Sequence, residues 1–184
     1  MQREPKLLVS SYALFGLAAG MFGPIYAVFV EQIGGDLLTA GGAYAAFSFA
    51  AGILIFIISR WEDHVKHKEK LVIGGYFVMT LGYLGYIMIR TPADLFVVQA
   101  VLGVGNAILS PAWDTIYSKR LDKGRYASEW GVWESMNYIV IALAALIGGF
   151  LANTFGFRFI FVVMFILSFV GFLVSLLLLF GKKK

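Results

Sequence analysis

Six stretches of this chain carry almost no charge, and each is long enough to cross a lipid bilayer as a helix. A bilayer core about 30 Å thick takes about 20 helical residues. The stretches cover residues 7–30, 39–59, 71–89, 95–118, 128–155 and 159–180. They fill nearly the whole chain, and short loops join antiparallel neighbours. We therefore expect an all-α membrane protein with six transmembrane helices, forming a single domain over residues 1–184.

The composition agrees with a chain whose solvent is lipid. Hydrophobic residues make up 60% of it and charged residues 14%, against about half and a quarter in a soluble domain. Without cysteine it can form neither disulfides nor thiolate metal sites. The sequence contains no Walker loop, no HExxH and no Ser-His-Asp arrangement, so we expect no ATP-driven activity, no enzyme and no cofactor. His64 and His67 lie in an exposed charged loop, and we expect no metal there.

The Lys and Arg residues predict the orientation in the membrane. With an even number of spans, both termini lie on one side. Thirteen of the 15 basic residues fall on that side: Arg3, Lys6, Arg60, Lys66, Lys68, Lys70, Lys119, Arg120, Lys123, Arg125 and Lys182 to Lys184. Only Arg90 and Arg158 fall on the other. We expect an integral protein of the cell membrane with both termini cytoplasmic, and basic loops that face lipid headgroups rather than nucleic acid.

Several local motifs occur in a recognisable order. The first span ends Gly23-Pro24-Ile25-Tyr26, and residues 59–68 form a charged loop with an acid followed by basic residues. Span four contains residues 99–105, Gln-Ala-Val-Leu-Gly-Val-Gly. Span five begins with residues 129–135 after a basic loop and ends near Gly148-Gly149. Together they resemble one six-helix half of a major facilitator superfamily transporter, which implies a 3+3 inverted repeat with units 1–94 and 95–184.

The resemblance also implies roles for the charged loop. In that family the loop's acid, here Asp63, meets neighbouring helix ends and stabilises one access state, which a carboxylate can do electrostatically. Ser59 and Lys66 stand where the family has two glycines, which puts the tight turn of this loop in doubt. The acid, Asp63, is retained. The expected gating set is Arg60, Asp63, His64, Lys68, Asp114 and Arg125. Asp114 would close a cytoplasmic charge network with the bases of this loop.

Two prolines lie in the spans that line the central cavity in the resembled family. Pro24 ends span one beside small residues, and Pro111 lies in span four. Proline removes a backbone donor and weakens the helix ladder, so both helices could bend there. The alternative is that proline is simply tolerated in membrane helices.

Polar residues within the spans are the candidates for contact with substrate or a coupling ion. Glu134, with Asn137 on the same helix face, is a candidate proton site or a partner for a cationic substrate. Alternatively, Glu134 lies at the cytoplasmic rim, paired with Arg125 or Lys119. Asn106 could face a cavity. The aromatic candidates for the cavity wall are Phe22 and Tyr26, whereas the tryptophans, Trp61, Trp113, Trp130 and Trp133, suggest an interfacial belt.

These observations favour a secondary transporter of a small solute, working by alternating access and coupled to protons. Few charges lie in the spans, which favours a hydrophobic or weakly cationic substrate. The superfamily's usual architecture has twelve spans, so two parallel copies could form a homodimer around one site. The alternative is a non-transporting subunit or a fragment that needs a separate second half. The run Gly181 to Lys184 reads either as a stop after the last helix or as the start of a longer loop.

Overall fold

The computed structural model describes residues 3–180, with side chains from residue 5 onward. Its elements are α1 (Arg3–Phe22), η1 (Gly23–Ile25), α2 (Tyr26–Gln32), α3 (Leu37–Glu62), α4 (Lys68–Met88), α5 (Pro92–Ser118), α6 (Tyr126–Phe155), α7 (Phe157–Leu176) and η2 (Leu177–Phe180). Six helical segments, with α1 to α2 and α7 to η2 each counted as one, are long and apolar enough to cross a membrane. The prediction of an all-α protein with six transmembrane helices is confirmed.

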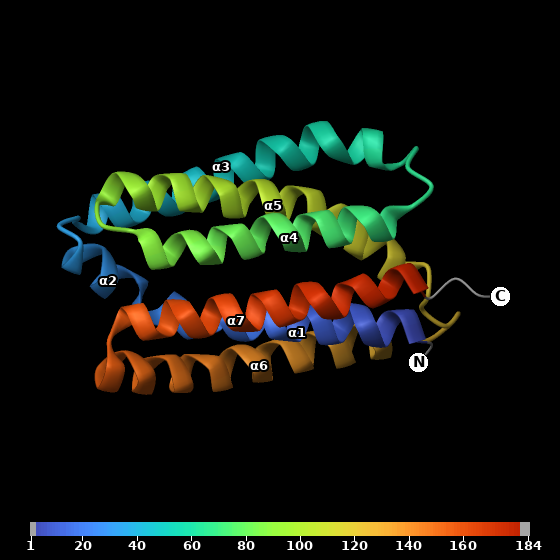
Figure 1. The fold of residues 1–184 in the computed structure, drawn as a ribbon. Helices are drawn as coiled ribbons and strands as arrows, with labels where there is room; N and C mark the ends of the chain where they lie inside the picture. Colours follow the sequence, from blue (N-terminus) through green and yellow to red (C-terminus); the bar gives the residue numbers. More distant parts are fainter. Residues whose placement is uncertain (1–2, 181–184) are drawn as a thin grey trace.

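The helices form two groups of three that lie side by side (Figure 1). One group contains α3, α4 and α5, and the other contains α1, α6 and α7. Within them, α5 packs against α3 and α4, and α1 packs against α6 and α7. A further contact between α4 and α7 joins the groups. The first helix of each proposed three-helix unit thus packs on the second and third helices of the other unit.

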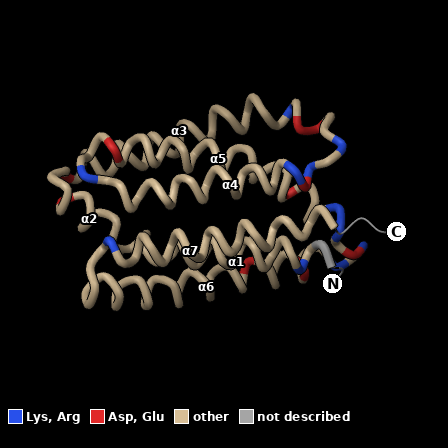
Figure 2. The backbone as a smooth tube through the Cα atoms, in the orientation of Figure 1, with Lys and Arg blue, Asp and Glu red and all other residues tan. Residues whose placement is uncertain are grey.

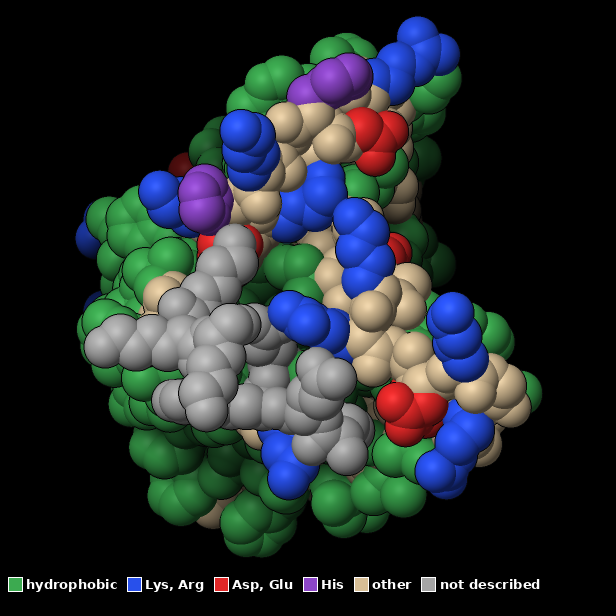
Figure 3. Space-filling view, turned by 90° about the vertical axis from the view of Figure 1, so that its right-hand side faces the viewer, with side chains coloured by type: hydrophobic (Ala, Val, Ile, Leu, Met, Phe, Trp, Pro, Cys, Tyr) green, Lys and Arg blue, Asp and Glu red, His purple; other side chains and the backbone are tan. Residues whose placement is uncertain are grey.

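The two ends of the bundle differ in charge (Figure 2). The basic end, as we call it, carries the start of α1, the loops 63–67 and 119–125, and the end of η2. Figure 3 shows this end with Lys, Arg and His side chains spread across it. The opposite end carries the α2–α3, α4–α5 and α6–α7 connections, with Arg90 and Arg158 as its basic residues. The run Gly181 to Lys184 lies outside the described residues.

Short connections separate the helices, and local hydrogen bonds cap the starts of two of them. The carboxylate of Asp36 accepts from the backbone N–H and the hydroxyl of Thr39, each at 2.7 Å, and so caps α3. These hydrogen bonds hold the pKa of Asp36 below its usual range. Thr91 and Asp94 form a capping box at the start of α5. Gly156, at φ +80°, supplies the left-handed residue between α6 and α7.

Small residues let the helices approach closely, as they do in lipid, where apolar burial alone does not drive helix association. A Cβ atom on Gly20 would lie 2.8 Å from that of Ala144, and one on Gly148 would overlap the backbone of Met21. These contacts bring α6 against α1. A similar approach brings α4 against α5, because a Cβ on Gly75 would lie 2.8 Å from the backbone nitrogen of Leu109.

The α1–α6 contact predicts a clear difference between two adjacent glycines. Gly148→Ala is expected to destabilise the protein by about 1–3 kcal/mol, because the new methyl group must push two helix backbones apart. Gly149→Ala is the matched control, since a Cβ there meets nothing within 4 Å. Thermal unfolding in detergent measures both. Equal melting temperatures for the two variants would show that α1 and α6 do not pack this closely.

Candidate functional site

A cavity of about 370 Å³ lies between the two helix groups. Its lining comes from both groups: Tyr12, Phe15, Gly16, Ala19, Phe22, Gly23, Tyr26, Tyr44, Phe47, Tyr76, Met79, Tyr83, Tyr86, Gln99, Leu102, Asn106, Leu109 and Met164. This volume lies in the range of pockets that hold small organic ligands. The position between helix groups is also where bundles commonly place their ligand sites.

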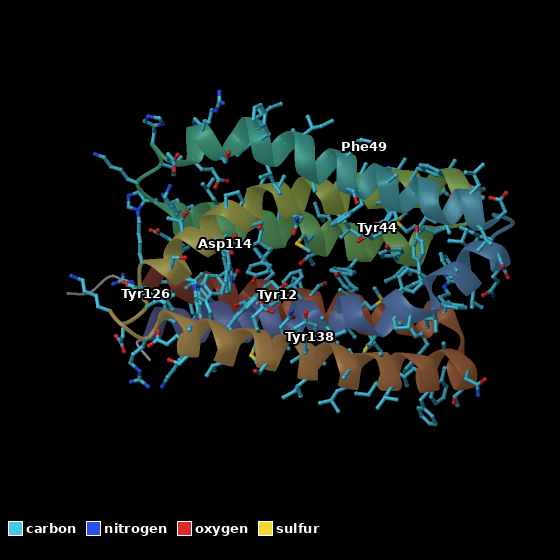
Figure 4. All side chains as sticks on the ribbon, turned by 180° about the vertical axis from the view of Figure 1, so that it is seen from behind. Tyr12, Tyr44, Phe49, Asp114, Tyr126 and Tyr138 are labelled. Atoms are coloured by element: carbon cyan, nitrogen blue, oxygen red, sulfur yellow. The ribbon has the colours of Figure 1, made fainter. Side chains whose placement is uncertain are left out.

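The cavity has a floor on one face of the bundle and a mouth on the other. The floor is made by α4, whose Tyr76, Tyr83 and Tyr86 are buried. At the other side Ala19 and Tyr44 line the cavity and remain exposed. Figure 4 views this second face, where α1 and α5 are flanked by α3 and α6. We call it the open face.

Tyrosines and two amides supply the polar groups of the cavity. Six of its lining residues are tyrosines, and no Asp, Glu, Lys or Arg of the described chain lines it. Gln99 donates from Nε2 to the Tyr26 hydroxyl at 3.1 Å and so ties α5 to α2. Asn106 is half-buried, and no hydrogen bond of its side chain is seen among residues 3–180. The site can therefore offer π-faces, hydroxyls and an amide, but no fixed charge.

Ring contacts hold the cavity wall in place. Phe15 stacks on Tyr76 with centroids 4.3 Å apart, and Phe22 meets Tyr26 and Tyr86 edge-on at 5.3 and 5.1 Å. Such offset and edge contacts are the favourable geometries for aromatic pairs. Because these rings come from α1, α2 and α4, they link the two helix groups across the cavity floor.

The structure brings together some of the residues proposed to contact substrate, but not all of them. Phe22, Tyr26 and Asn106 line the cavity. Asn137 lies half-buried on α6 near Gly16, and Glu134 is exposed on the same helix; neither lines the cavity of a single chain. The alternative pairing of Glu134 with Arg125 or Lys119 is also absent, because Glu134 forms no salt bridge with any residue from 3 to 180.

Sequence reasoning missed the tyrosines of α4. Tyr76, Tyr83 and Tyr86 are spaced by seven and three residues, which places them on one helix face. This spacing was a usable signal, since a polar-tipped aromatic recurring at helical period marks a face in contact with something other than lipid. Charged residues within spans gave the more conspicuous signal, but they do not line the cavity.

The residues proposed for gating lie toward the basic end. Asp63 lines a second cavity of about 450 Å³ with Lys66, Lys68, Lys119 and Arg120, among others. Lys68 donates from Nζ to the backbone oxygen of Glu62.

Two other proposed gating residues pack onto α3 itself. The Arg60 guanidinium lies over the Phe56 ring, 5.1 Å from its centroid, and the imidazole of His64 contacts the backbone oxygen of Arg60 at 3.0 Å. Asp63 thus faces several cations while forming no salt bridge within residues 3–180.

Asp114 and Arg125 lie apart from that cavity. Asp114 is exposed on α5, and Figure 4 shows it near Tyr12 of α1 toward the basic end. Arg125 immediately precedes α6, and its backbone oxygen accepts from the Ser128 hydroxyl.

Three of the four tryptophans, Trp113, Trp130 and Trp133, form a cluster between helices rather than the belt that the sequence suggested. Trp113 is buried, and its ring centroid lies 5.6 Å from that of Tyr12 and 5.4 Å from that of Trp133. Trp130 extends the cluster to Trp133 at 5.6 Å. The reason is that α1, α5 and α6 converge here, so these rings face helices. Trp61 remains exposed.

The two prolines lie in different local structure. Pro24 sits in η1, a single 3-10 turn that separates α1 from α2. Pro111 lies inside an uninterrupted α5, where the Thr115 hydroxyl donates to its backbone oxygen at 2.8 Å. A local break in the ladder thus accompanies Pro24, at the edge of the cavity, whereas α5 continues through Pro111.

Six helices apolar enough to cross a membrane, with a solute-sized cavity between them, indicate an integral membrane protein. The family model described as Major Facilitator Superfamily matches residues 8–184. The chain belongs to the major facilitator superfamily, as the motifs in its sequence indicated.

Three relatives show how broad that family is. The chain is 24% identical to the uncharacterized MFS-type transporter YitZ of Bacillus subtilis (strain 168) over 84% of its length, and 26% identical to the proton-coupled antiporter flippase LtaA of Staphylococcus haemolyticus over 63%. It is 26% identical to a uridine/deoxyuridine transporter of Lactococcus lactis over 97% of its length. The chain covers 93% of YitZ but only 28% and 36% of the other two.

Proposed function

We propose that this chain is a half-size secondary transporter that moves a small solute by alternating access as a parallel homodimer. The observation that carries the proposal is the aromatic cavity between α1 and α5, which opens on the face flanked by α3 and α6. One six-helix chain leaves this cavity open on one side. A second half is needed to enclose a solute and expose it to each side of the membrane in turn.

The second half is proposed to be another copy of the same chain. In the most hydrophobic stretches of α3 and α6, 11% of the residues are buried, against 50% in that of α5, so much of the surface of the helices flanking the open face is uncovered in a single chain. A twofold axis along the membrane normal would place α3 of one copy against α6 of the other and face the two cavities toward each other. Both copies would have cytoplasmic termini, as the placement of Lys and Arg favours.

The proposed substrate is a small aromatic or hydrophobic solute that is neutral or weakly cationic. Tyrosine faces attract organic cations through the ring quadrupole, and no fixed cation of the described residues lines the cavity to repel them. The same lining offers no charged partner for a polyanion. The relatives' names mention uridine in one case and a flippase in another, so the proposal rests on this lining rather than on their substrates.

Glu134 is the proposed proton-coupling residue. It lies on α6 beside the open face, and the Asn137 amide follows it one turn along the same helix. In the homodimer two copies of Glu134 would flank the joint cavity and titrate as a coupled pair. LtaA, which is proton-coupled by name, is a relative of this chain, and this also favours coupling.

The direct test is transport by the purified chain in proteoliposomes. Tetraphenylphosphonium serves as the probe because it is an aromatic cation without hydrogen-bond requirements. We expect an imposed pH gradient to drive its movement in proportion to the amount of protein. No protein-dependent flux at any gradient or membrane potential would contradict the proposal for this substrate class.

Glu134→Gln tests the coupling separately from transport. The amide keeps the shape of the carboxyl group but cannot release a proton, so we expect downhill movement of tetraphenylphosphonium to continue while its dependence on the pH gradient is lost. Glu129→Gln, on the first turn of the same helix, is the control. Gradient-driven uptake that is unchanged in Glu134→Gln would remove this residue from the mechanism.

A second candidate function is that of a subunit or fragment that transports only with a different second half. The observation that favours it is that the chain covers 28% and 36% of two longer transporters. The two candidates differ in a simple way. A subunit would stay single and inactive alone in proteoliposomes, whereas the homodimer would be active without any other polypeptide.

A further inference from the structure

A second cavity of about 680 Å³ lies at the opposite end of the bundle and shares only Tyr86 with the lining of the tyrosine cavity. The end of α2, the α4–α5 connection and the start of α7 surround it. Its lining residues are Phe29, Gln32, Ile33, Tyr86, Ile87, Met88, Ile89, Arg90, Phe155, Gly156, Phe157, Arg158 and Phe161. Nothing in the proposed transport cycle uses this cavity.

The cavity collects both basic residues of the opposite end. Arg90 follows α4 and Arg158 lies in the first turn of α7, yet both line this one space. Neither guanidinium forms a salt bridge within residues 3–180, and no carboxylate is among the lining residues. The nearby Asp94 carboxylate accepts from the backbone N–H groups of Arg90 and Thr91, at 3.0 and 2.9 Å, and feels the Arg90 charge from beyond salt-bridge distance.

Two guanidinium groups that share a cavity without a salt bridge favour an anion between them. Like charges repel, and an anion bound between them attracts both and so offsets that repulsion. Guanidinium groups are well suited to phosphate, because they donate parallel hydrogen bonds to two of its oxygens. The start of α7, which no side chain among the described residues caps, lies in the same cavity and adds positive potential there.

The remaining lining is apolar and points to an amphiphile rather than a free ion. Phe29 and Phe161 are buried at the base of the cavity, and Met88 and Phe155 at its rim are 72% and 58% exposed. Because α4 and α7 span the membrane, this rim lies where headgroups meet acyl chains. A ligand held here would place its anionic head on the arginines and its tail along the apolar surfaces of α4 and α7.

We propose that this cavity binds the phosphodiester headgroup of an anionic phospholipid such as phosphatidylglycerol. A zwitterionic headgroup fits less well, because its amine would find no carboxylate in the described lining. If both termini are cytoplasmic, as proposed above, this lipid belongs to the outer leaflet; only this detail of the inference depends on the proposed orientation. Binding would tie α2, the end of α4 and the start of α7 together at the end where the α6–α7 connection is a single glycine.

Hydrogen–deuterium exchange of the full chain in nanodiscs tests this site locally, which matters because the basic end will also attract anionic lipid. We expect phosphatidylglycerol in a phosphatidylcholine bilayer to slow exchange in residues 86–92 and 155–160 of the natural chain. The double variant Arg90→Gln/Arg158→Gln should lose that protection. The matched control Lys70→Gln/Lys123→Gln removes two basic-end charges and should keep it.

Three results would overturn the proposal. They are the absence of any phosphatidylglycerol effect in the natural chain, protection that persists in Arg90→Gln/Arg158→Gln, and equal protection from inorganic phosphate in pure phosphatidylcholine. The last would assign the site to a soluble anion. None of these readouts depends on transport, so failure here and failure of the proposed transporter function are distinguishable.

Discussion

Ala19→Trp is expected to abolish movement of tetraphenylphosphonium in proteoliposomes while leaving the protein folded. Ala19 is exposed on α1 at the mouth of the tyrosine cavity, between Gly16 and Gly23 on the same lining. An indole there would project into a space of about 370 Å³ that otherwise accepts the solute. We expect at least about a tenfold loss of flux, equivalent to about 1.4 kcal/mol or more.

The control for this variant puts the same side chain on the surface turned away from the cavity. Val170 is 42% exposed on α7, which does not border the open face, and Val170→Trp should transport normally. Thermal unfolding of both variants separates blocking from misfolding. Normal flux through a well-folded Ala19→Trp protein would show that the solute does not pass through this cavity.

Cysteines placed on α3 and α6 are expected to cross-link two copies of the chain. The natural sequence has no cysteine, so Ser48→Cys/Ile141→Cys introduces the only thiols. Both positions are exposed and lie at a similar depth in their helices. In the proposed dimer, the α3 thiol of one copy meets the α6 thiol of the other copy. We therefore expect mild oxidation or a short bis-maleimide to convert most of the protein to a covalent dimer.

The arrangement of helices makes this result specific. Within one chain α3 and α6 belong to different helix groups and flank opposite edges of the open face, so an internal link between them is not expected. The control, Leu84→Cys/Val162→Cys, places thiols at exposed positions of α4 and α7. It should give little dimer at the same protein-to-lipid ratio. Equal dimer yields from both pairs would indicate random collision in the membrane.

The sequence predicted the fold well because lipid imposes simple rules on it. The spans were visible as uncharged stretches, and their ends fall within a few residues of those observed, since caps such as Asp36 and Thr91 lie where charge returns. The resemblance to one half of a major facilitator superfamily transporter likewise agreed with the family match.

The site was harder to predict, because helical phase decides which residues share a cavity. Phe22, Tyr26 and Asn106 were expected near substrate and do line the cavity, whereas Glu134 lies outside it in a single chain. An apolar helix in lipid shows little contrast in hydrophobicity between its buried and exposed faces. The sequence therefore says little about which face of the helix points into the protein. The spacing of Tyr76 and Tyr83 places them on one face of α4, but only the structure shows that this face forms the floor of the cavity.

The number of copies per transporter tests the central claim most directly. Native mass spectrometry of the purified chain, released from nanodiscs, gives that number from the mass of one chain, 20.3 kDa. The account predicts a complex of two chains that persists on dilution and with different lipids. A single chain under all of these conditions, together with an inactive preparation, would contradict the homodimer and make the search for a different second half the next task.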